Sequence, residues 1–89
     1  MPLFEIESPH TKDECAAQLK ELQSQGKEVL GKFVWGCPAG THTAWATVEA
    51  QNENAARELV PKIVRDKAKV TRVEKFTPEQ VKDMFRTHA

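Results

Sequence analysis

Apolar and polar residues alternate in two runs between positions 33 and 48, around a turn of sequence Pro-Ala-Gly. Such alternation is typical of β-strands, and the pattern predicts a central β-hairpin. With an even-numbered loop, Trp35 lies opposite Ala44 and Phe33 opposite Ala46, so that large residues meet small ones on one apolar face. The other face carries a mixed set, namely Val34, Thr43, Trp45, Thr47 and Glu49.

The segment before the hairpin predicts a strand followed by a helix. Alternation over positions 3–8 indicates a half-buried strand with Glu5 and Glu7 on its polar side. A capping box then starts a helix over 12–25, with apolar residues at helical spacing until a glycine stops it.

The segment after the hairpin predicts a second helix, a fourth strand and a last short helix. Asn52 is a good helix cap, but Pro61 removes a backbone donor, so we expect a kink or a break into two short pieces there. Positions 69–76 suit a strand, and Thr77 followed by proline starts the last helix. This helix has an apolar stripe that needs a surface to pack on: Val81, Met84 and Phe85.

The order of these elements predicts an α+β fold in one domain, residues 1–89. A βαββαβ chain of this kind indicates the ferredoxin-like arrangement, an antiparallel sheet with helices on one face, here extended by a short C-terminal helix. Right-handed crossovers give the spatial strand order 4-1-3-2. One face of the sheet would then be bare.

The composition argues against some classes of function. Thirteen basic and thirteen acidic side chains give a formal charge of zero, which argues against binding to nucleic acid or to an anionic membrane. No segment approaches membrane-spanning length, and nothing at the N-terminus resembles a signal peptide, so we expect a cytoplasmic protein with its two cysteines reduced. A domain of this size buries only roughly 60–65% of the surface that its unfolded chain exposes, so its stability alone is modest, and this favours a homodimer.

Several residues of the hairpin carry a resemblance to a known group of proteins. They are Trp35-Gly36-Cys37, Gly40-Thr41-His42, Trp45 and Val48-Glu49, together with the opening Met1-Pro2-Leu3-Phe4. With them the chain resembles small bacterial proteins of unknown function in the dimeric α/β-barrel superfamily, in which two ferredoxin-like sheets pack their bare faces together. The resemblance implies a fold and a homodimer. It leaves open whether the protein is an enzyme, because that superfamily contains both enzymes and ligand-binding proteins.

Four residues able to bind a metal are expected at one edge of the sheet. In this topology the end of the first strand, the start of the first helix and the hairpin turn lie together, which gathers His10, Cys15, Cys37 and His42. These side chains, or a subset centred on His42 with His10 and Cys37, could bind a transition metal, and no other cofactor is expected. Two alternatives remain open: Cys37 and His42 act as a catalytic thiol and its base, or Cys37 fills the core while His42 bonds the backbone near the turn.

The bare sheet face is the first candidate for a small-molecule site. Trp45 and Thr43 would share it with Glu5 and Glu49, and a carboxylate such as Glu49 in a dry cavity could carry protons in a cofactor-free enzyme. The remaining alternatives are a metal-binding protein using the His/Cys edge and an interaction module without chemistry, in which the bare face serves only assembly.

Overall fold

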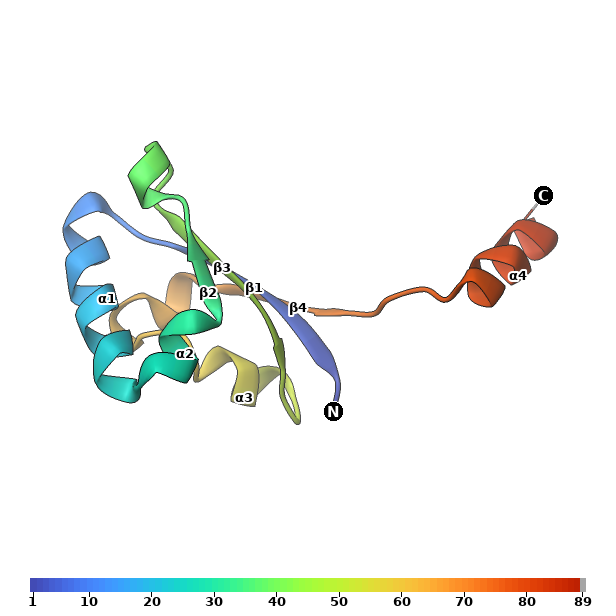
Figure 1. Cartoon of the computed structure of the whole chain (residues 1–89), viewed down its shortest axis with the longest axis horizontal. Helices are drawn as coiled ribbons and strands as arrows, with labels where there is room; N and C mark the ends of the chain where they lie inside the picture. Colours follow the sequence, from blue (N-terminus) through green and yellow to red (C-terminus); the bar gives the residue numbers. More distant parts are fainter. Residues whose placement is uncertain (89) are drawn as a thin grey trace.

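The computed structural model describes residues 1–88 as a four-stranded sheet with helices packed on one side and a last helix standing apart (Figure 1). The strands are β1 (Leu3–Pro9), β2 (Phe33–Trp35), β3 (Thr43–Glu49) and β4 (Lys69–Val73). The helices are α1 (Lys12–Gln25), α2 (Lys27–Gly31), α3 (Glu53–Arg57) and α4 (Pro78–His88), with 3₁₀ turns η1 (Cys37–Ala39) and η2 (Lys62–Lys67).

All neighbouring strands of the sheet are antiparallel, in the order β2-β3-β1-β4. Read from the other edge, this is the order 4-1-3-2 that right-handed crossovers predict. The hairpin also has the predicted register, with Phe33 opposite Ala46 and Trp35 opposite Ala44. The prediction of an α+β fold with an antiparallel four-stranded sheet is therefore confirmed.

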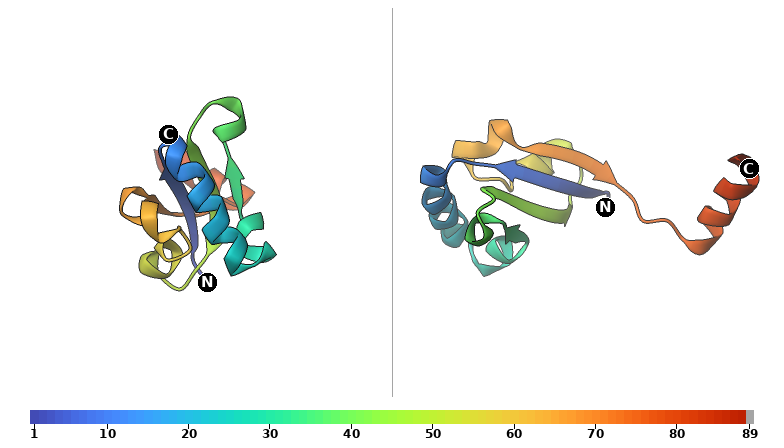
Figure 2. Two further views of the ribbon diagram at one scale, coloured as in Figure 1. Left: turned by 90° about the vertical axis from the view of Figure 1, so that its left-hand side faces the viewer. Right: turned by 90° about the horizontal axis from the view of Figure 1, so that it is seen from above.

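The core lies between one face of the sheet and the helices. Phe4 and Ile6 of β1 are buried there beside alternate residues of β3, and Leu22 of α1 covers them. The opposite face, which we call the bare face, has no helix over it (Figure 2). Its residues on the three longer strands are Leu3, Glu5, Glu7, Thr43, Trp45, Thr47, Glu49, Lys69, Thr71 and Val73, with Val34 from β2.

Proline divides the second crossover as expected. α3 starts at the Asn52 cap, whose side chain accepts a hydrogen bond from the Ala55 amide at 2.8 Å, and it ends before Pro61. The chain resumes as η2, because proline offers no amide for a continuous helix.

The hairpin differs from the prediction in one respect. β2 ends at Trp35, and the backbone then turns through η1, where the amides of Ala39 and Thr41 both bond the Gly36 carbonyl. Cys37 therefore sits in a 3₁₀ turn and not in a strand. Pro38 lies in the first turn of η1 and has no amide for a strand ladder, which explains the early end of pairing.

Two further features differ from the prediction, namely the end of β4 and the presence of α2. β4 ends at Val73, which leaves Phe76 in the connection to α4 with 63% of its surface exposed. α2 was not predicted, although its Val29 and Leu30 pack against the core.

Candidate metal centre

Three separate parts of the chain meet at the end of β1. His10 directly follows β1, His42 directly precedes β3, and the His10 amide donates to the His42 carbonyl at 3.0 Å. Cys37 opens η1 above them, and Cys15 lies in the first half of α1. The topology therefore brings together all four residues that the sequence placed at this edge.

The ligand atoms of His10, Cys37 and His42 all lie within 4.8 Å of one another. His10 Nε2 is 2.9 Å from Cys37 Sγ, and the rings of His10 and His42 meet edge to face with centroids 6.0 Å apart. Cys15 Sγ lies 3.1 Å from Cys37 Sγ. The three atoms of His10, Cys37 and His42 are close enough for one ion to contact them, whereas Cys15 lies beside Cys37 and outside this group.

The backbone orients the His10 ring. Its Nδ1 lies 3.3 Å from the Ser8 carbonyl, which can only accept, so Nδ1 carries the proton. The lone pair of Nε2 then faces Cys37 Sγ. A histidine that binds a metal through one nitrogen commonly donates its other N–H to a carbonyl in this way. Only 7% of the His10 surface is exposed, so the ring has little freedom to turn elsewhere.

His42 holds a buried nitrogen with no protein partner. Among the described residues, nothing forms a hydrogen bond with its Nδ1. An unsatisfied buried polar atom costs roughly 1–3 kcal/mol, so native proteins seldom leave one without a ligand, an ion or a water. The expectation that His42 bonds the backbone near the turn finds no support at this atom.

The Cys37 thiol is protonated in the metal-free protein. Burial raises its pKa, and the neighbouring Cys15 thiol raises it further. A catalytic thiolate needs the opposite shift, which a nearby cation or a helix N-terminus supplies. The environment of Cys37 therefore disfavours the nucleophile that the sequence left open. The base in contact with its sulfur is His10, whereas the sequence paired Cys37 with His42.

The bare-face candidates lie apart from this cluster. Thr47 Oγ1 donates to Glu5 Oε2 at 2.5 Å, and Trp45 Nε1 donates to Glu7 Oε1 at 3.4 Å. Glu5 and Trp45 line an open hollow of about 290 Å³. Thr43 is half-buried at the end of β3 nearest His42.

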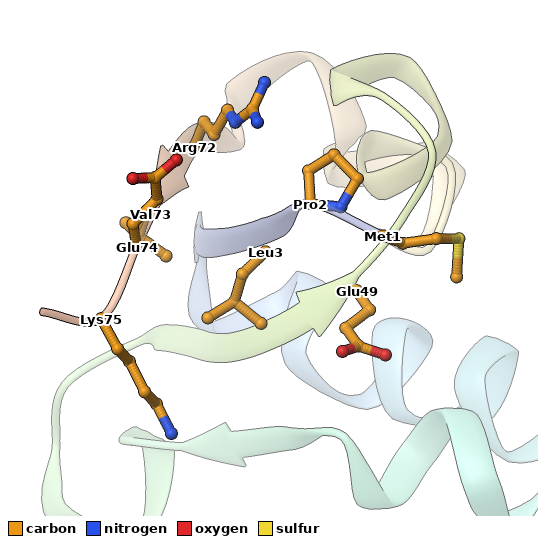
Figure 3. Close-up of a pocket in the computed structure, with 8 residues that line it drawn as sticks. All are labelled: Met1, Pro2, Leu3, Glu49, Arg72, Val73, Glu74 and Lys75. Carbon is orange, nitrogen blue, oxygen red and sulfur yellow. The ribbon is translucent and has the colours of Figure 1, made fainter. Parts of the chain in front are cut away.

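Glu49 lines a different hollow, of about 680 Å³, at the far end of the sheet (Figure 3). There Leu3 lies between Glu49 and Val73, its neighbours on the adjoining strands. Glu5 and Glu49 thus do not share one closed cavity, and a small-molecule site on this face stays a prediction.

Comparisons with protein-family models, curated proteins and solved structures found no match. Within residues 1–88, no helix is long and apolar enough to cross a membrane.

Proposed function

We propose that this protein binds one transition-metal ion of the zinc class per chain, through His10, Cys37 and His42. Two observations carry the proposal: one ligand atom of each of these three residues lies within 4.8 Å of the other two, and the buried Nδ1 of His42 forms no hydrogen bond with any described residue. An ion bound there would also contact the His10 Nε2 lone pair that faces Cys37.

The donor chemistry selects the class of metal. Two imidazole nitrogens and one thiolate suit borderline or soft ions such as Zn²⁺, Cu⁺ and Ni²⁺, whereas Mg²⁺ and Ca²⁺ require oxygen ligands. Cys15 is close enough to Cys37 to serve as a fourth ligand, which would complete an N₂S₂ set. Four protein ligands would favour Zn²⁺ in a closed tetrahedral site, whereas His10, Cys37 and His42 alone would leave one position open. Binding of the ion is the function that we assign to the site.

The surroundings support reversible binding. His10 is buried and held by the Ser8 carbonyl, whereas Cys15, Cys37 and His42 are only half-buried. A rigid inner ligand with more accessible outer ones lets an ion enter from solvent.

A competition titration tests the proposal. Tag-free protein, stripped with a chelator and kept reduced, is titrated with Zn²⁺ against a chromophoric chelator. One ion per chain is expected. His42→Ala and Cys37→Ser should each weaken binding by more than the roughly 10–100-fold that loss of a supporting residue costs. Glu49→Gln, at the far end of the sheet, is the matched control and should bind as the wild type does.

Cobalt substitution reads out the ligand set directly. Thiolate ligation of Co²⁺ produces charge-transfer absorption in the near ultraviolet, and tetrahedral geometry produces strong visible bands. Cys15→Ser should reduce the intensity of the thiolate charge-transfer band, and Cys37→Ser should reduce it more than Cys15→Ser does. Absence of stoichiometric binding, or binding untouched by His42→Ala, would overturn the proposal.

We also propose the finer fold class, the ferredoxin-like arrangement. The strand order, the antiparallel neighbours and the crossovers packed on one face support it. The second crossover departs from a regular helix because Pro61 divides it into α3 and η2.

A further inference from the structure

Helix α4 stands away from the rest of the molecule. Figures 1 and 2 show it beyond the end of β4, joined to that strand only by residues 74–77. The radius of gyration is 15.8 Å, whereas a compact chain of this length has about 12 Å. The difference reflects this one helix.

One side of α4 is apolar and exposed. Phe85 is 72% exposed and Met84 44%, and they line an apolar hollow together with Val81 and Phe76. A capping box of Thr77 and Gln80 starts the helix, with hydrogen bonds of 2.8 and 3.1 Å, so its sequence specifies a helix at this place. An isolated helix this short is marginal in water, and it needs packing of its apolar side to persist.

The bare face of the sheet offers a surface of matching character. Leu3, Val73 and Trp45 provide apolar area there, and Val34 at the edge is 65% exposed. Three glutamates, Glu5, Glu7 and Glu49, lie among them and form no ion pair in the described part of the chain, and Lys69 lies opposite Glu7 on the same face. An isolated chain thus exposes both an apolar helix and a partly apolar sheet face with more acidic than basic side chains.

Charge and size agree between the two surfaces. Lys82 lies beside Val81 and one turn before Phe85, so it borders the apolar stripe, whereas Arg86 lies on the polar side with Glu79 and pairs with Asp83 at 3.7 Å. Lys82 complements the glutamates of the bare face. The helix has 11 residues and is about 16 Å long, close to the roughly 14 Å between the outer strands of a four-stranded sheet.

The segment between β4 and α4 favours packing of α4 on a partner chain rather than on its own sheet. Its four residues include no glycine, and the residue before Pro78 is biased toward extended backbone, which carries α4 away from its own sheet. We propose that α4 of each chain packs on the bare face of a second copy, with Lys82 facing the partner's glutamates. Reciprocal exchange makes a closed twofold dimer and leaves neither surface exposed. The proposal does not depend on the metal centre, because His10, Cys37 and His42 lie outside the four strands.

Light scattering coupled to size exclusion tests the apolar contact. The wild-type chain should elute at twice its 10.0 kDa mass. Phe85→Ser should shift it to the monomer and weaken dimerisation at least about tenfold, because the aromatic ring no longer leaves water. Glu79→Ser, on the exposed polar side of α4, is the matched control and should remain dimeric. A monomeric wild type, or a Phe85→Ser dimer as strong as the wild type, would overturn the proposal.

Charge reversal tests whether the exchange occurs between chains. One variant carries Lys82→Glu, and a second carries Glu5→Lys and Glu7→Lys. Each alone should be monomeric through like-charge repulsion, and an equimolar mixture should form a heterodimer, because both of its contacts then join opposite charges. Circular dichroism of each variant checks that it is folded. Two folded variants that stay monomeric when mixed would refute the exchange and indicate docking within one chain.

Discussion

Gly36 occupies the tightest point of the hairpin that carries Cys37 and His42. A Cβ added there would lie 2.6 Å from the Thr41 carbonyl oxygen and 3.0 Å from the Trp45 ring. Gly36→Ala should therefore lower the free energy of unfolding by about 1–3 kcal/mol, the usual cost of overpacking, and should weaken Zn²⁺ binding because the turn moves.

A second glycine supplies the control. Gly31 has no atom within 4 Å of an added Cβ, so Gly31→Ala should leave stability unchanged or raise it by up to about 1 kcal/mol. Urea unfolding of both variants measures the contrast. Equal stability of the two would show that the turn yields more easily than its geometry indicates.

Gln18 is a buried polar side chain with half of its amide unsatisfied. Its Oε1 lies 3.5 Å from Ser8 Oγ, a long hydrogen bond, and its Nε2 has no partner among the described residues. Gln18→Met removes the unsatisfied amide at similar volume and should stay within about 1 kcal/mol of the wild type. Gln18→Ala leaves a cavity and should cost about 2–4 kcal/mol. A Met variant as unstable as the Ala variant in urea would reveal a partner for this amide, such as a buried water.

For individual residues, the sequence predicted which side chains lie near one another but not which atoms are in contact. Topology alone placed His10 and His42 at one edge, because the strands that carry them adjoin. The contact between Cys37 and His10 could not be foreseen, since it depends on the hairpin ladder ending at Trp35. The buried His42 Nδ1 gave no signal in the sequence at all.

The start of α1 and the end of η2 are joined by an ion pair. Lys67 Nζ lies 2.5 Å from Glu14 Oε1, and the same carboxylate accepts the Thr11 amide of the capping box. Lys67, followed by Thr11, lowers the pKa of Glu14 from 4.5 to about 2. A carboxyl group whose pKa is depressed by folding stabilises the folded state above its unfolded pKa, and this stabilisation is lost as the pH falls through the folded value.

Stability should therefore decline as the pH falls from about 4.5 to about 2. Glu14→Gln should make this decline shallower, whereas Glu58→Gln, on an exposed residue that forms no side-chain ion pair in the described part of the chain, should leave it unchanged. Thermal unfolding across that pH range provides the measurement. Parallel profiles for wild type and Glu14→Gln would rule out the linkage.

The helix starts and breaks that depend on nearby residues in the sequence were predicted. The short helix that depends on tertiary packing was not. The division at Pro61 follows from proline's missing amide, and the Thr77 capping box follows from side-chain chemistry. α2 begins directly after Gly26, which the sequence interpreted as the end of helical structure. Val29 and Leu30 in this connection were expected to reach the core and do so, but no local pattern specifies the single helical turn that carries them.

The bare sheet face is the feature of the whole molecule that the sequence predicted best. It follows from two helical crossovers on one side and from the alternation of Glu5 and Glu7 with buried residues. The position of α4 could not be predicted in the same way, because an apolar stripe shows that a helix needs a partner without showing where the partner is.

The proposed metal ligands lie outside the four strands that carry the proposed dimer contact, so the effects of metal binding and of dimerisation on stability should add. Zn²⁺ at about 100 times its dissociation constant should stabilise each chain by about 2.7 kcal/mol, which raises the melting temperature by roughly 10 °C or more. Dimerisation should instead make the melting temperature rise with protein concentration.

Two single substitutions separate these effects. His42→Ala should abolish the rise with Zn²⁺ and keep the dependence on protein concentration, whereas Phe85→Ser should do the reverse. The double variant should lose both, with changes in free energy that sum to within about 0.5 kcal/mol, as expected for distant sites without shared partners. Loss of the zinc response in Phe85→Ser would mean that α4 of the partner reaches the metal edge and that the two sites are coupled.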